Sequence, residues 1–94
     1  MMNIYLITFF ADGVERESQL VSHIKDYGIW ARLTNTTWCI KVADTTTVAI
    51  RDNLNSKLPL QQNERLMVIQ ITDSSWASYN MPKSVVEWLK EDNK

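Results

Sequence analysis

The sequence predicts a single α+β domain whose strands and helices follow the order β-α-β-β-α-β, with a C-terminal appendage. Three observations support this. Residues 3–10 are apolar on both faces, as in a strand at the centre of a sheet. Residues 15–27 and 46–58 carry apolar side chains at helical spacing. Residues 29–42 contain two β-rich runs separated by a short turn, as in a hairpin.

The first strand, residues 3–10, ends without a carboxylate. Small nucleases with this layout need a carboxylate at the tip of the strand to hold a metal, and here the tip is Phe9-Phe10. The first carboxylate of the chain, Asp12, follows two residues later beside Gly13. The strand therefore indicates a fold and argues against that activity.

The two expected helices have recognisable ends. After the first, Gly28 occupies the position of a left-handed C-terminal cap. Before the second, Asp44 is expected to cap the N-terminus, and Pro59 is expected to end the helix. Each helix carries one apolar stripe, formed by Leu20, Val21, Ile24 and Tyr27 in the first and by Thr47, Ile50, Leu54 and Leu58 in the second.

The hairpin and a fourth strand complete the expected sheet. In residues 36–42 the alternation places Trp38, Ile40 and Val42 on one face, and we expect Trp38 to be buried under the helices. Residues 65–71 form the fourth strand, which is apolar on both faces like the first.

Four strands and two helices in this order define a ferredoxin-like plait, in which both helices cover one face and strands one and three are central. The fourth strand is then an edge strand, although two apolar faces are typical of a covered one. Either the tail, residues 72–94, or the sheet of a second subunit would cover it. We therefore expect a single domain, residues 1–94, that forms a homodimer, with residues 72–94 as a C-terminal arm used in dimerisation.

The arm contains the most unusual stretch of the chain, residues 73–80, in which small hydroxyl side chains accompany Trp76 and Tyr79. Such side chains can bind a nucleobase by stacking and its phosphate through hydroxyl contacts. They can equally anchor a subunit interface, where aromatic residues concentrate, and we favour this interpretation. Pro82 opens a short third helix. The expected interface residues are Phe9, Trp76, Tyr79 and Trp88.

The composition restricts the function without identifying it. The net charge is −1 and the two signs are interspersed, whereas a dedicated nucleic-acid binder usually shows a basic excess. Folding could still gather basic side chains onto one surface, where Arg16, Arg32 and Lys41, together with Lys25, are the candidates for contact with nucleic acid or a nucleotide. No apolar stretch approaches the length that spans a bilayer, so we expect a cytoplasmic protein without a membrane partner.

Neither Cys39 nor His23 indicates a catalytic site. A single cysteine excludes an internal disulfide and a cysteine-based zinc site, and its place in an apolar strand is typical of an inert thiol. His23 lies off the apolar stripe of its helix and is expected at the surface. We expect no cofactor, with Mg²⁺ held at a displaced site around Asp12 as the alternative.

Several core segments together resemble the small bacterial proteins described as SinR-like, which are grouped with the CRISPR-associated adaptation subunit and the VapD-type toxins. The similar segments cover most of the chain and are residues 5–8, 36–41, 50–54, 64–68 and 88–90. The resemblance implies a ferredoxin-like homodimer whose two sheets pack face to face, with C-terminal segments reaching across. In the CRISPR-associated branch, an aspartate that closes the first strand of each subunit holds a divalent metal. The matching positions here are Phe9 and Phe10, and a phenyl ring cannot ligate Mg²⁺.

Three functions remain open from the sequence. The first is a noncatalytic homodimeric scaffold that acts on nucleic acid, a nucleotide or a protein partner. The second is a metal-dependent nuclease with a rearranged site, in which Asp12 pairs across a dimer axis with Asp73 or Ser74 nearby. The third is a regulator or inhibitor carried by a mobile element. We favour the first, because Phe10 stands where the nuclease branch has its metal ligand.

Overall fold

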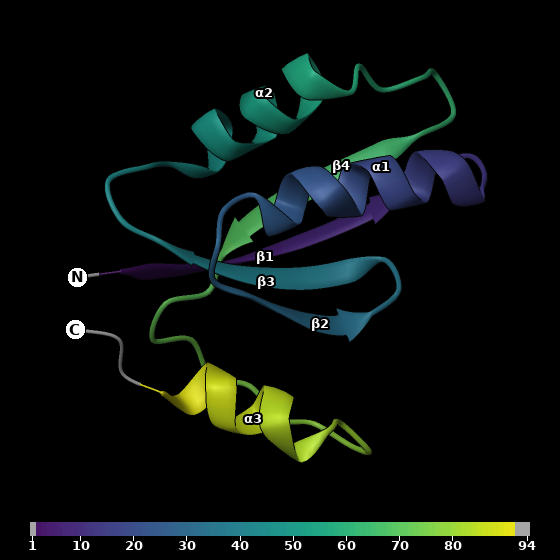
Figure 1. Ribbon diagram of the computed structural model, residues 1–94. Helices are drawn as coiled ribbons and strands as arrows, with labels where there is room; N and C mark the ends of the chain where they lie inside the picture. Colours follow the sequence, from purple (N-terminus) through teal and green to yellow (C-terminus); the bar gives the residue numbers. More distant parts are fainter. Residues whose placement is uncertain (1, 92–94) are drawn as a thin grey trace.

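A computed structural model describes residues 2–91, and within them the chain forms four strands and three helices (Figure 1). The α+β class predicted from the sequence is therefore confirmed. The elements in chain order are β1 (Asn3–Phe10), α1 (Val14–Lys25), β2 (Trp30–Thr34), β3 (Thr37–Val42), α2 (Thr47–Lys57), β4 (Arg65–Gln70) and α3 (Lys83–Lys90).

The four strands form one sheet in the order β2-β3-β1-β4, and every neighbouring pair is antiparallel. Tyr5 of β1 stands opposite Ile40 of β3 on one side and Gln70 of β4 on the other, so β1 is paired along both edges. The ladder continues past β4, where the N–H of Ile71 donates to the carbonyl of Ile4 at 2.8 Å. In this order β1 and β3 are the inner strands, and β2 and β4 are the edges.

The hydrophobic core lies between one face of this sheet and the helices α1 and α2 (Figure 1). Trp38 is buried there, as its place in the alternation of β3 predicts, and its indole N–H donates to the carbonyl of Asn35 at 3.2 Å. A buried indole with a satisfied N–H contributes apolar area without an unpaired donor. The core is built mainly from Tyr5, Ile7, Phe9, Leu20, Ile24, Trp38, Ile40, Ile50 and Leu54.

The N-terminus of α2 is capped by a different residue from the one expected. The side-chain oxygen of Thr46 accepts a hydrogen bond from the N–H of Ala49 at 3.0 Å. Asp44 instead has a φ of 57°, in the left-handed region, and belongs to the turn that precedes the cap. The physical reason is position: only the residue directly before the helix can reach the free N–H groups of its first turn.

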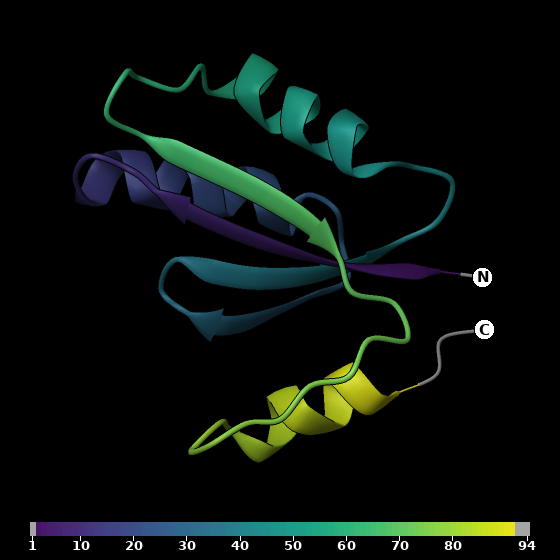
Figure 2. The same ribbon diagram turned by 180° about the vertical axis from the view of Figure 1, so that it is seen from behind.

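The second face of the sheet is covered on one half only. Helix α3 packs against β2, and the side chains of Ala31, Cys39 and Val85 are buried on that side. The other half, formed by β1 and β4, carries no helix in the described part of the chain, and in Figure 2 β4 lies in front with α1 behind it. The segment between β4 and α3 crosses from one half to the other without regular structure (Figure 2).

Candidate functional site

The end of the molecule next to the tip of β1 is organised by an ion pair. Arg16 of α1 donates two hydrogen bonds to the Glu64 carboxylate, from Nε to Oε2 at 2.8 Å and from Nη2 to Oε1 at 2.7 Å. The same carboxylate accepts the backbone N–H of Asp12 at 2.8 Å and that of Gln61 at 2.9 Å. These contacts, the Arg16 bonds first, lower the pKa of Glu64 to about 2. Glu64 therefore stays ionised and joins three segments of the chain.

Asp12, which the sequence offered as a metal ligand only in the alternative interpretation, belongs to this same network. Its Oδ2 accepts a hydrogen bond from the Asn63 side-chain amide at 3.1 Å, so the carboxylate holds two loops together. Within the chain, Asp73 and Ser74 lie at the opposite end of the sheet from Asp12, because β4 runs antiparallel to β1. Across residues 2–91, no three His, Cys, Asp or Glu side chains gather closely enough to hold a metal ion.

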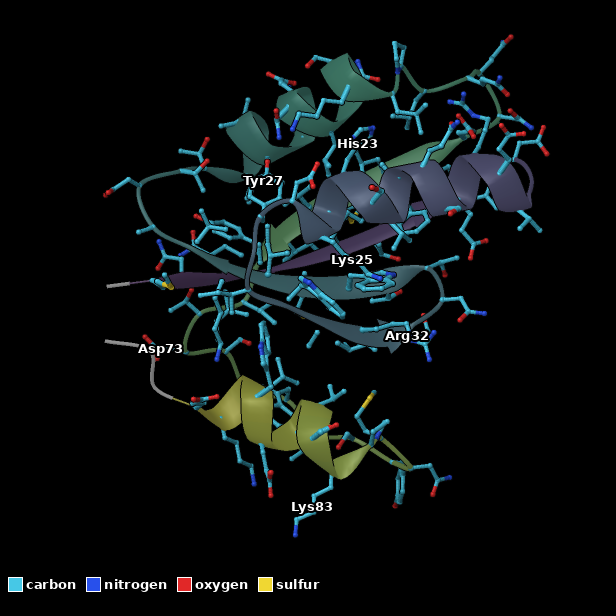
Figure 3. The ribbon with its side chains drawn as sticks, in the orientation of Figure 1. His23, Lys25, Tyr27, Arg32, Asp73 and Lys83 are labelled. Carbon is cyan, nitrogen blue, oxygen red and sulfur yellow. The ribbon has the colours of Figure 1, made fainter. Side chains whose placement is uncertain are left out.

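The two residues considered as catalytic groups lie on opposite sides of the sheet. Cys39 is fully buried on the α3 side, and burial raises the pKa of its thiol to about 11, so it is not a thiolate near neutral pH. His23 is on α1 (Figure 3). Its Nδ1 lies 3.7 Å from the Asp26 carboxylate. The imidazole is partly covered rather than fully exposed. The two side chains therefore do not form a nucleophile–base pair.

Lys41, a predicted nucleic-acid contact, lies inside the structure. Its side chain is 2 % exposed, and Nζ donates to the carbonyls of Trp88 at 2.6 Å and Glu91 at 3.2 Å. Nζ also lies 4.2 Å from the centroid of the Trp88 ring. An ammonium at the C-terminal end of a helix satisfies free carbonyls and complements the helix dipole. Lys41 therefore fastens α3 to the sheet and does not present its charge to a partner.

Arg32, in contrast, is exposed on the edge strand β2 and lies beside an aromatic pair. The rings of Trp30 and Trp38 are 5.4 Å apart, and Lys25 Nζ lies 4.8 Å from the Trp30 ring and 5.5 Å from the Trp38 ring. Figure 3 shows Lys25 extending from α1 towards the β2–β3 hairpin that carries Arg32. Neither Lys25 nor Arg32 forms a salt bridge with a carboxylate among the described residues.

Sequence reasoning placed Arg16, Arg32 and Lys41 in one group, and the structure separates them. Arg16 is held by Glu64 and Lys41 by α3, which leaves Arg32 as the exposed cation. Trp30 was missed as a candidate site residue. The sequence could have indicated Trp30, because it precedes Arg32 by two residues in the same strand. Side chains at that spacing point to the same face of a sheet.

The four residues expected at a dimer interface have different environments. Phe9 is buried in the core of the chain beneath the helices, so its ring is not available to a partner. Trp88 is occupied by its contact with Lys41. Trp76 and Tyr79 are exposed in the segment between β4 and α3.

A continuous apolar surface occurs instead on the uncovered half of the sheet. We call it the open face and define it as Leu6, Thr8 and Phe10 of β1 with Met67 and Ile69 of β4. The register places Leu6 opposite Ile69 and Thr8 opposite Met67, so these side chains are direct neighbours on one face. Phe10 is 49 % exposed, Met67 57 % and Ile69 44 %. The doubly apolar character of the fourth strand is therefore real, and nothing within residues 2–91 covers its outer face.

No protein-family model matches the chain, and no curated protein or solved structure is significantly similar to it. In the part of the chain that the structure describes, no helix is both long enough and apolar enough to span a membrane.

Proposed function

We propose that the protein is a homodimeric, noncatalytic binding module, in which two ferredoxin-like subunits pack together through their open faces. The open face carries this proposal. It presents three large apolar side chains, Phe10, Met67 and Ile69, that are each close to half exposed. Met67 and Ile69 are successive residues on this face of β4, and Phe10 of β1 lies diagonally across from Met67. Contiguous apolar surface of this kind marks an interaction site, whereas isolated exposed apolar residues need no explanation.

A second copy of the chain is the partner that fits this surface best. The open face is nearly free of charge, with Arg65 opposite Phe10 at its margin, so a partner needs apolar area more than complementary charge. A sheet face can pair with its own copy about a two-fold axis without requiring a second kind of surface. A chain of 94 residues also gains apolar burial by sharing a core.

The strand order supports the fold assignment within this proposal. In a ferredoxin-like plait the first and third strands are central and the hairpin partner and last strand form the edges, which is the order β2-β3-β1-β4. The kinship with SinR-like and CRISPR-associated adaptation proteins remains a proposal that rests on the similar core segments. Its face-to-face dimer is the arrangement proposed here.

A noncatalytic role is supported by what the chemically capable side chains do. Asp12 and Glu64 hold loops together, and Cys39 is a buried thiol with a raised pKa. The nuclease alternative would have to release Asp12 from Asn63 and find further oxygen ligands from another copy.

Light scattering coupled to size-exclusion chromatography tests the dimer. We expect wild type to elute with twice the mass of one chain and Ile69→Glu, which places a charge in the open face, to elute as a monomer. Val14→Glu is the matched control, because Val14 is exposed on the helix side of the subunit and should leave the dimer intact. A monomeric wild type at tens of micromolar, or a dimer that survives Ile69→Glu, would contradict the proposal.

A further inference from the structure

We infer that the groove between β2 and α3 binds a nucleoside phosphate, with the base against tryptophan and the phosphate on Arg32. The inference supplies a ligand for the binding module proposed above, but the groove lies within one subunit and does not require the dimer. It has a volume of about 370 Å³ and is lined by residues from both elements, including Trp30, Arg32, Ser84 and Trp88. This volume is at the lower end of the ~300–1,000 Å³ typical of small-molecule sites.

The charge of the groove selects an anion. Among the described residues that line it, Arg32 is the one ionisable group, and no carboxylate is present. Lys25 Nζ lies 4.8 Å from the Trp30 ring on the α1 side of β2, so it is a nearby positive charge but does not line the groove. Because neither cation has a carboxylate partner within residues 2–91, an incoming phosphate does not have to displace one.

A second cavity provides an internal comparison. It has a volume of about 310 Å³ and lies at the other end of α3, where Asp73 and Glu91 line it together with Lys41 and Lys90. Charges of both signs there do not favour an anion. Of the two, only the groove beside β2 combines a cation with two indole rings and no acid.

The aromatic walls select a planar group next to that anion. Trp30 is 39 % exposed, and its ring lies on the α1 side of β2, 5.4 Å from the Trp38 ring. Trp88 borders the groove from α3, with the Lys41 ammonium 4.2 Å from its ring centroid. Indole rings stack with any nucleobase, because every base has a π-face, and this contact is tolerant of base identity. We therefore expect little discrimination between the four bases.

Hydrogen-bonding groups of the edge strand also face the groove. The N–H of Lys41 donates to the carbonyl of Ile29 at 3.0 Å, which fixes the alternation of the β2–β3 ladder. By that alternation, Trp30 and Arg32 turn their backbone N–H and C=O groups away from β3, towards the outer edge. With the Ser84 hydroxyl on α3, they can contact the ribose or the edge of a base.

Isothermal titration calorimetry with adenosine 5′-monophosphate, adenosine and inorganic phosphate tests the inference. We expect the monophosphate to bind, and adenosine to bind about tenfold more weakly because it lacks the charge-assisted contact to Arg32. Inorganic phosphate, which has no ring, should give no detectable heat. Failure of the monophosphate to bind at millimolar concentration would overturn the proposal.

Variants locate the site. Arg32→Gln should weaken binding of the monophosphate about tenfold, whereas Arg65→Gln should leave it unchanged. The two arginines are matched, since both are exposed on edge strands and neither forms a salt bridge among the described residues. Circular dichroism confirms that each variant is folded. Equal weakening by both substitutions would show general charge attraction and would overturn the site.

Two further experiments distinguish a free nucleotide from a nucleic-acid strand as the ligand, and test the nucleotide site independently of the dimer. An eight-nucleotide single strand that binds far more tightly than the monophosphate, and still depends on Arg32, identifies a polymer as the source; comparable affinities identify a free nucleotide. The Ile69→Glu variant should bind the monophosphate as wild type does. If wild type is monomeric and still binds the monophosphate through Arg32, the nucleotide site is supported and the dimer is contradicted. If wild type is dimeric but shows no Arg32-dependent binding, the dimer is supported and the nucleotide site is contradicted.

Discussion

Arg16 and Glu64, which are 48 positions apart in the chain, form a two-pronged ion pair with bonds of 2.8 and 2.7 Å. The Glu64 side chain is only 3 % exposed, and its two oxygens together accept four hydrogen bonds. This carboxylate ties the turn after β1 to the connection before β4. The same contacts lower the pKa of Glu64, so folding favours the ionised carboxylate and the stability of the fold depends on that ionisation.

The first prediction concerns acid. Because the folded state holds the pKa of Glu64 near 2, below its ordinary value of 4.5, ionised Glu64 stabilises the fold above pH 4.5. This contribution is lost progressively as the pH falls through 4.5 towards 2. Glu64→Gln should lower the melting temperature at neutral pH, and its difference from wild type should narrow on acidification. Differential scanning calorimetry across this pH range measures both effects.

A matched control for this prediction is Asp52→Asn. Asp52 also pairs with an arginine, Arg51, but both side chains are more than half exposed. Exposed ion pairs contribute little, so this variant should melt close to wild type at every pH. A Glu64→Gln curve parallel to wild type at all pH values would contradict the linkage.

The second prediction concerns the core. Trp38→Ala should destabilise the protein by about 3–5 kcal/mol, because it removes a buried indole between the sheet and the helices. Urea unfolding followed by circular dichroism measures this. Tyr79→Ala, which truncates an exposed ring, should change stability by less than about 1 kcal/mol. A loss below about 1 kcal/mol for Trp38→Ala would mean that the faces of β3 are assigned incorrectly.

The third prediction concerns the attachment of α3. Lys41→Met keeps the apolar stem but removes the ammonium that holds the carbonyls of Trp88 and Glu91. We expect α3 to detach more easily, by about 1–3 kcal/mol of local opening free energy. Hydrogen exchange of the α3 amides measures this. Lys90→Met, which removes an exposed lysine from the same helix, should leave exchange unchanged; equal protection in wild type and Lys41→Met would exclude the fastening role.

The fourth prediction separates the binding module from the nuclease. Asp12→Ala removes the hydrogen bond with Asn63 and should cost no more than about 1 kcal/mol. It should not alter any response to Mg²⁺ or Mn²⁺ in a thermal-shift experiment. Metal-dependent cleavage of DNA or RNA that disappears in Asp12→Ala would establish the nuclease in place of our proposal.

The sequence allowed the elements to be predicted well where a short-range pattern determines them. The alternation in β3 predicted the burial of Trp38, and the helical stripes predicted the burial of Ile50 and Leu54. The N-terminal cap of α2 was harder to predict, because Asp44 and Thr46 are both residue types that favour this position and lie two residues apart. Which of them is the cap depends on the residue at which the helix begins.

Long-range partnerships could not be predicted in the same way. Nothing in the local sequence around Arg16 indicates Glu64, since their contact depends on how the turn after β1 meets the loop before β4. Lys41 could be placed on the face opposite Trp38, but the helix that covers that face lies nearly fifty residues later. Because these two long-range interactions could not be predicted, Arg16 and Lys41 were grouped with Arg32 as candidates for nucleic-acid binding, although both are held by other parts of the chain.

As the proposed dimer interface, the open face makes the stability of the protein depend on its concentration. In the proposed dimer, the exposed side chains of Met67 and Ile69 are covered by another copy, so the fraction of chains that are protected depends on the protein concentration. The melting temperature of the proposed dimer should then rise with protein concentration. The chain would be most vulnerable to unfolding, and to proteases that act on the unfolded form, when it is scarce. The rate at which the protein is degraded would therefore fall as its concentration rises.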